Sequence, residues 1–152
     1  MRYVEALGVA FLILLGLLVL LFTRREFIAR GPGTIGMSMR LSTLLPGRGW
    51  ASGLGRFTGD ELRWYRLFSL APRPRRVLVR HHLRVEQQRP PQGPERLAMP
   101  DGWVVLRCNA VARSAYSRKP EDGGVELALA ASAVTGFLSW IESAPPKALR
   151  RS

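Results

Sequence analysis

The chain has 152 residues, with 23 lysines and arginines against 11 aspartates and glutamates, and a formal net charge of +12. This length leaves room for one small domain with its own core, and a single cysteine excludes an intrachain disulfide framework. An excess of positive charge on this scale predicts an acidic partner, such as anionic lipid headgroups, nucleic acid or an acidic protein surface.

Residues 6–22 form an unbroken apolar run, ALGVAFLILLGLLVLLF, without a charge or a proline. An apolar helix of about 17 residues rises roughly 25 Å, and flanking residues at the interfaces extend it to the thickness of a bilayer core. We therefore expect a retained transmembrane helix. A cleaved signal peptide fits less well, because bulky and basic residues follow the run where a small-residue cleavage site should lie. A core helix also fits poorly, because the rest of the chain is too small to enclose it.

Basic residues gather on one side of the run. Only Arg2 and the terminal amine precede it, whereas three arginines follow closely: Arg24, Arg25 and Arg30. The positive-inside rule then predicts an N-terminus outside and a C-terminal domain in the cytoplasm, anchored in the plasma membrane. The lone Cys108 agrees with a reducing compartment. We assign residues 1–23 to the anchor and residues 24–34 to a basic juxtamembrane linker.

Residues 35–143 carry the patterns of a small β domain. In residues 31–42 apolar side chains alternate with small or polar ones after a Gly/Pro hinge, which is typical of a half-buried strand. Residues 50–70 predict a hairpin that bends at residues 58–60, with Leu62, Trp64, Phe68 and Leu70 on one face of its second strand. Further strands are predicted in residues 76–88, 103–111 and 125–129, separated by connectors in residues 71–76, 89–96 and 112–124.

The apolar period changes to three and four between Ala130 and Ile141, which predicts one amphipathic helix ending near Ser143. We expect the basic tail, residues 144–152, to be disordered. One transmembrane helix, five to seven antiparallel strands and a C-terminal helix give an α+β fold class. This order matches a pleckstrin-homology-like barrel, in which the terminal helix, here carrying Trp140, plugs one open end. An open sheet with one covering helix remains the alternative.

Gly31, Gly33 and Gly36 satisfy the pattern G-x-G-x-x-G. The dinucleotide-binding motif joins a strand to a helix whose N-terminus holds the pyrophosphate. Here the glycines follow an apolar helix and lead into a strand, so we interpret them as a hinge and expect no cofactor.

The remaining candidate chemistry is sparse. His81 and His82 are adjacent, so in a strand they point to opposite faces, and Cys108 has no CxxC partner; we therefore expect no metal site. Cys108 with either histidine is the alternative of a membrane-attached cysteine-dependent enzyme, but Cys108 falls on an apolar strand face. The pair Asp60-Glu61 is interpreted as turn chemistry. We assign no catalytic residues and expect a protein that is not an enzyme.

A second basic cluster follows the hairpin and comprises Arg73, Arg75, Arg76, Arg80 and Arg84. Such a patch suits phosphates of lipid or an acidic protein surface, and the chain lacks a nucleic-acid-binding signature. We expect membrane lipids with anionic headgroups as partners, together with a neighbouring membrane protein complex. The predicted function is a membrane-anchored domain that tethers or assists such a partner, or alternatively an anionic-lipid-binding module.

Three phrases of the sequence are distinctive: FTGDELRWYRLFSLAPRPRRVL, PERLAMPDGWVVLRC and ELALAASAVTGFLSWIESAPP. With them the chain resembles a family of short, single-pass actinobacterial membrane proteins classified as a domain of unknown function. The resemblance covers nearly the whole length, and its most specific parts are DELRWYR (60–66) and GFLSW (136–140). It implies frequent encoding near the ATP synthase genes and assigns no catalytic residues.

Overall fold

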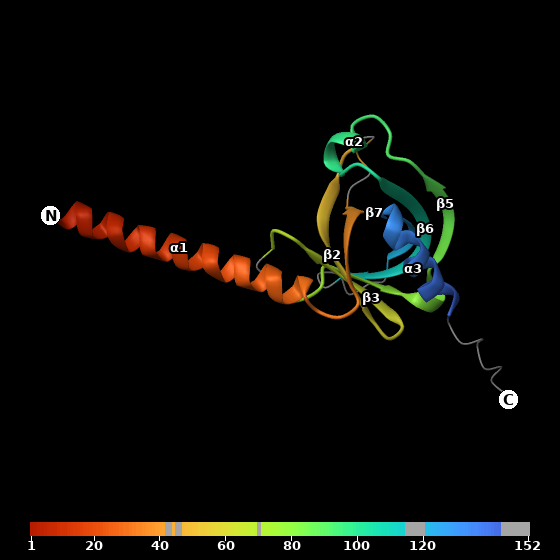
Figure 1. Cartoon of the computed structure of the whole chain (residues 1–152), viewed down its shortest axis with the longest axis horizontal. Helices are drawn as coiled ribbons and strands as arrows, with labels where there is room; N and C mark the ends of the chain where they lie inside the picture. The colour runs from red at the N-terminus through yellow and green to blue at the C-terminus, as the bar shows by residue number, and fades with distance from the viewer. Residues whose placement is uncertain (42–43, 45–46, 70, 115–120, 144–152) are drawn as a thin grey trace.

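Helix α1, Arg2–Ala29, projects from the rest of the chain as a single long rod (Figure 1). The computed structural model describes residues 1–41, 44, 47–69, 71–114 and 121–143. No part of the apolar window of α1 is buried against the domain, and the helix is long and apolar enough to cross a membrane. It continues through most of the predicted linker of residues 24–34, because nothing breaks a helix before Gly31-Pro32-Gly33. Glu26 and Arg30 pair across its last turn at 3.0 Å.

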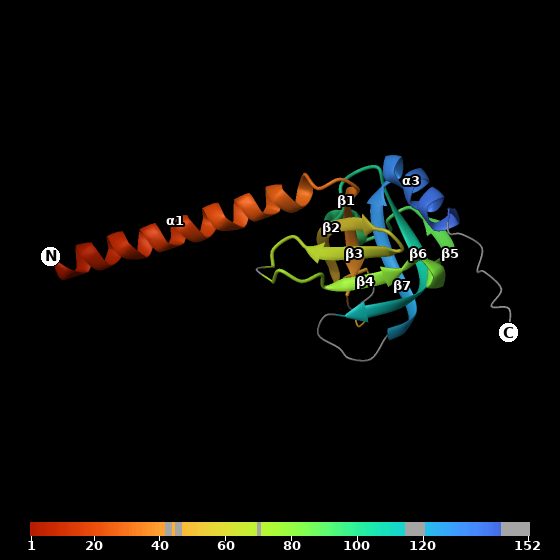
Figure 2. The same ribbon diagram turned by 90° about the horizontal axis from the view of Figure 1, so that it is seen from below.

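Seven antiparallel strands follow in the described part of the chain: β1 Thr34–Arg40, β2 Trp50–Thr58, β3 Glu61–Arg66, β4 Arg76–Val79, β5 Arg84–Arg89, β6 Trp103–Ser114 and β7 Glu121–Ala130. Their order is β4-β3-β2-β1-β7-β6-β5, and β4 also pairs with β6. This last pairing, with Leu78 opposite Ala112, closes the sheet on itself (Figure 2). The structure is therefore a closed barrel and not an open sheet.

Alternating apolar side chains fill the barrel, as the period of two predicts. The largest fully buried side chains are Trp64, Met37, Met39, Leu62, Leu78, Leu106, Leu127 and Leu129 from the strands, together with Phe137 from the C-terminal helix. The Trp64 indole also donates to the Met37 carbonyl at 3.3 Å, so its polar atom is satisfied inside the core.

The single strand predicted over residues 76–88 is wrong. A short 3-10 turn, η1 Arg80–His82, divides it into β4 and β5, which pair with different neighbours. Leu78 and Leu83 are five positions apart, so an uninterrupted strand would place them on opposite faces. The turn shifts the inward–outward alternation of side chains by one position, so Leu78 and Leu83 are both buried.

The predicted inward position of Phe68 is also wrong. Strand β3 ends at Arg66, the Leu67 amide donates to the Ser52 carbonyl at 3.0 Å, and the chain then leaves the sheet. The Phe68 side chain is 87% exposed. Leu70 lies outside the described residues.

Helix α3, Ala131–Glu142, confirms the predicted C-terminal helix. It buries Val134 and Phe137 in the barrel core, and Phe57 packs on Phe137 and Trp140 with ring centroids 6.4 and 4.9 Å apart. The Trp140 indole donates to the Gly59 carbonyl at 3.1 Å, which fixes α3 to the β2–β3 turn. The predicted tail, residues 144–152, lies outside the described residues.

A second, smaller apolar cluster lies on the outer face of the sheet. The buried residues Met99, Val105 and Ala128 form it, with the half-buried Trp50 and Trp103 packed against them. The short helix α2, Glu95–Ala98, precedes Met99 in the segment that joins β5 to β6. This segment therefore packs onto the barrel wall.

Candidate membrane-proximal site

The loop between β3 and β4 lies against the C-terminal part of α1. The Arg24 guanidinium on α1 donates to the backbone carbonyls of Ser69 and Ala71 in this loop. Figure 2 shows the loop extending from the barrel in the direction of the N-terminal end of α1. A charged side chain on the helix thus holds a loop from the domain beside the apolar run.

An apolar groove of about 430 Å³ opens between the two segments. Helix α1 supplies one wall and the loop supplies the other, and the lining residues are Leu18, Leu21, Phe22, Arg25, Leu67 and Phe68. The side chains of Leu18 and Phe22 are 54% and 61% exposed. The groove is therefore continuous with the part of α1 that would face lipid in a bilayer.

Charge lies at the domain end of this groove. A small adjoining cavity is lined by Leu21, Arg24, Arg25, Leu54, Tyr65, Arg66, Leu67 and Ser69, so Arg25 and Arg66 share its wall. Leu18 precedes Arg25 by seven residues, which is roughly 10 Å along a helix. The apolar part of the groove consequently lies toward the apolar run, and the guanidinium groups lie toward the barrel.

A neighbouring face of α1 has a different electrostatic character. A second open groove there is lined by Phe22, Thr23, Glu26, Phe27, Arg30, Gly31, Pro32 and Arg56. Arg30, which the sequence places among the membrane-proximal arginines, is paired with Glu26. Positive charge on this side is partly compensated.

The predicted second basic cluster is divided by the fold. Arg73 and Arg75 are exposed on the β3–β4 loop, and Arg76 begins β4 as a half-buried residue. Arg84 is exposed on β5, which pairs with β6 and not with β3 or β4. Arg73 and Arg75 therefore lie on the loop that contributes Leu67 and Phe68 to the α1 groove, whereas Arg84 lies on a different strand.

Arg80 is held within the fold. Its guanidinium donates to the Asp60 carboxylate and to the Ser143 hydroxyl at 3.3 Å, and it lies over the Trp140 ring at 5.7 Å. His81 adds a contact with Asp60 at 3.1 Å. These contacts join η1, the β2–β3 turn and the end of α3, and they leave the Arg80 side chain only 11% exposed. Arg80 is thus a structural residue here.

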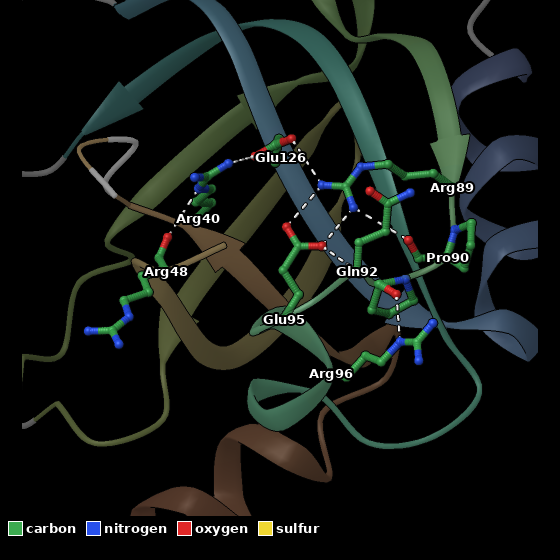
Figure 3. Close-up of polar contacts among 9 residues, drawn as sticks. Arg40, Arg48, Arg89, Pro90, Gln92, Glu95, Arg96 and Glu126 are labelled. Carbon is green, nitrogen blue, oxygen red and sulfur yellow. Dashed lines mark hydrogen bonds and ion pairs between the residues drawn. The ribbon is translucent and has the colours of Figure 1, made fainter. Parts of the chain in front are cut away.

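Four charged residues on the outer wall of the barrel form a network (Figure 3). Arg89 makes a two-pronged contact with Glu95, at 2.6 and 2.9 Å, and reaches Glu126 at 3.5 Å. Arg40 also donates to Glu126. The hydrogen bonds from Arg89 lower the pKa of the buried Glu95, which also accepts from the Gln92 amide at 3.0 Å. Glu95 is therefore ionised at neutral pH, with its oxygens occupied, and is unsuited to donate a proton.

Cys108 is fully buried, and burial raises the pKa of its thiol to about 12. At neutral pH the group is a protonated thiol, whereas the nucleophilic form is the thiolate. His81 and His82 are both exposed. The geometry gives no support to a cysteine–histidine dyad.

The glycine motif and the histidines show no ligand geometry. Gly33 has a φ of 71° in the turn before β1, and its carbonyl accepts from the Phe57 amide at 3.0 Å, so the motif opens a strand and not a helix. In the residues that the structure describes, no three histidine, cysteine or acidic side chains are grouped to hold a metal ion.

Sequence reasoning did not identify Arg66, Leu67 and Phe68 as site residues. The pattern of residues 60–70 assigned them to a strand, and only the position of α1 shows that the chain turns toward the helix. It also missed the network of Figure 3, in which Arg40 and Glu126 are 86 residues apart.

Comparisons with known proteins match nearly the whole length of the chain. A family described as "Protein of unknown function (DUF2550)" matches residues 11–147. An uncharacterized protein of Mycobacterium tuberculosis is 39% identical over 145 residues, covering 95% of this chain and 94% of the relative. An uncharacterized protein of Mycobacterium leprae is 37% identical over the same share of both chains. No solved structure matches.

Proposed function

The chain belongs to the DUF2550 family of proteins of unknown function, and we propose that it is a single-pass membrane protein that is not an enzyme. In this proposal α1 spans the plasma membrane and holds the β domain against the cytoplasmic leaflet. The position of the β3–β4 loop carries the proposal, because Arg24 ties that loop to α1 where the apolar run ends. A domain fixed in this way does not swing freely below the membrane.

The domain acts as a tether under this proposal. An anchor raises the local concentration of a weak binding surface at the membrane, so modest contacts with lipid or with a neighbouring membrane complex suffice. Basic residues near the surface each gain about 1 kcal/mol from an anionic leaflet. Arg25, Arg66 and Arg73 are exposed on the side that carries α1 and the β3–β4 loop, and we assign the contact surface to them and to Arg75.

We further place the barrel among pleckstrin-homology-like folds. The support is its closed antiparallel barrel with a C-terminal helix that buries Val134 and Phe137 in the core. A fold of this kind hosts several functions, so the tethering proposal rests on the site and not on the fold.

Topology is tested by fusing reporters to the C-terminus of the full chain. We expect green fluorescent protein to fluoresce there, alkaline phosphatase to be inactive, and the protein to stay in membranes after alkaline extraction. The mass of the purified chain should equal that of the full sequence, which shows that residues 1–23 are retained. Active phosphatase would show that the C-terminal domain lies outside the cytoplasm. Release by alkali would show that α1 does not span the membrane.

The contact surface is tested by cross-linking in native membranes. We expect charge reversal of Arg66 and Arg73 to reduce the recovery of cross-linked partners, while reversal of Arg84 leaves recovery unchanged. Equal recovery from all variants at physiological salt would show that this surface binds no partner.

A further inference from the structure

We propose that the groove between α1 and the β3–β4 loop is a binding site for one anionic phospholipid. An acyl chain lies along the apolar walls, and the phosphate meets Arg25 and Arg66. This inference rests on the proposed function for the insertion of α1 in a bilayer, and it names the ligand class of that same surface.

The apolar walls identify the occupant. Leu18 and Phe22 are exposed on the apolar run, so in a membrane they contact acyl chains whether or not the loop is present. Leu67 and Phe68 add a second wall facing them, which converts one lipid-facing strip of the helix into a two-sided groove. Its volume of about 430 Å³ lies in the range of roughly 300–1,000 Å³ typical of small-molecule sites.

Phe68 is the most informative of these residues. Its side chain is 87% exposed on a loop whose backbone is tied to the helix by Arg24. A large aromatic residue held next to lipid-facing leucines suits the interface between headgroups and acyl chains, where amphipathic segments bury their apolar face about 5–10 Å deep. The loop therefore enters the leaflet that holds the bound lipid.

The charges select the headgroup. Among the residues that the structure describes, neither Arg25 nor Arg66 is paired with a carboxylate, and both line the cavity adjoining the groove. The planar guanidinium fork matches phosphate oxygens, and two such groups favour a lipid with net negative charge over a zwitterionic one. The neighbouring groove, which shares Phe22 with this one, contains the Glu26 carboxylate paired with Arg30. We therefore place the phosphate at Arg25 and Arg66.

The test uses the full chain in nanodiscs that contain phosphatidylcholine and phosphatidylglycerol. A trace of either lipid carries a photoreactive diazirine at the end of one acyl chain, and adducts are mapped by mass spectrometry. We expect adducts on the β3–β4 loop and the facing part of α1, several-fold more from the phosphatidylglycerol probe. Millimolar inorganic phosphate at constant ionic strength should leave them unchanged.

Variants separate the two halves of the site. Phe68→Asp should reduce loop adducts at least fivefold, with an unchanged unfolding midpoint because the side chain packs on no core residue. Combined Arg25→Gln and Arg66→Gln should remove the preference for phosphatidylglycerol. The matched controls are Leu97→Asp, at a 93% exposed position on α2, and Arg84→Gln on β5, and neither should change adducts or preference.

Adducts spread evenly around α1, without headgroup preference and unaffected by Phe68→Asp, would overturn the lipid site while leaving the anchor intact. Loss of adducts with inorganic phosphate would assign the charged half to a free anion, and a chain-to-chain cross-link through the groove would assign it to a second copy. Either result overturns the proposal. Failure of the chain to enter nanodiscs would overturn both this inference and the anchored function.

Discussion

Replacing Glu95 by glutamine tests the network on the outer wall of the barrel. Glu95 is buried, and its carboxylate receives two hydrogen bonds from Arg89 and one from the Gln92 amide. Glutamine has nearly the same shape, but its side-chain NH2 group would face one N–H donor of the Arg89 guanidinium. The substitution therefore removes the charge and one hydrogen bond with little change in packing.

The surroundings of the ion pair determine how much stability Glu95→Gln should lose. Removing one partner of a fully buried ion pair costs about 3–5 kcal/mol. Arg89 keeps a contact with Glu126 at 3.5 Å, and its side chain is 20% exposed, so part of its charge remains compensated. We therefore expect a loss of about 2–3 kcal/mol in the free energy of unfolding. For a domain of this size that is a fall in Tm of roughly 6–15 °C.

The assay is thermal unfolding of the full chain in detergent, followed by intrinsic tryptophan fluorescence. Glu61→Gln is the matched control, because it breaks a partly exposed pair with Arg63 and should cost less than about 1 kcal/mol. A Glu95→Gln variant that melts within 2 °C of this control would refute the role of the network in stability.

Three further predictions use the same material. Since the folded pKa of Glu95 is lowered from 4.5, the stability it provides is present above about pH 4.5 and lost as pH falls through the lower folded value; the gap between wild type and Glu95→Gln should shrink only there in acid melts. Cys108 should react with thiol reagents only after unfolding, because its pKa is about 12 and it is buried; rapid native labelling would reopen the enzyme hypothesis. Gly53→Ala should cost at least about 1–3 kcal/mol in chemical unfolding, since the new Cβ would lie 2.3 Å from the Tyr65 carbonyl oxygen, whereas Gly36→Ala, with open space around it, should stay within about 0.5 kcal/mol; equal costs would contradict this packing.

Local pattern was enough to predict most elements of the fold. The structure confirms the strand predicted from the alternation of Met37 and Met39. It also confirms the hairpin bend after Thr58 and the C-terminal helix whose apolar period ends near Ile141. These signals work because one face of each element is buried in a common core. They fail at Leu83, which points into the core because a 3-10 turn precedes it, and no glycine or proline marks that turn in the sequence. They fail again at Phe68, whose apolar side chain continues the strand pattern after the strand has ended.

The contacts of the candidate site were less accessible to sequence reasoning, because they use groups that leave no sequence pattern. Arg24 binds two backbone carbonyls, 45 and 47 residues away. Every residue has a carbonyl, so nothing in the sequence marks Ser69 or Ala71 as its partner. Arg89 and Glu95 are close in sequence, but Arg40 and Glu126, which complete the network, come from other strands.

Arg24 and Arg25 show why proximity in sequence is a poor guide to role. Neighbouring side chains on a helix point about 100° apart, so two adjacent arginines can have different hydrogen-bond partners even where both line one cavity. Both count equally in the positive-inside rule, which depends on charge near the end of the span and not on side-chain direction. The fold then divides them: Arg24 is used to hold the β3–β4 loop, and Arg25 remains at the mouth of the groove. Arg24 thereby positions one wall of the groove, and in our proposal Arg25 contacts the lipid phosphate.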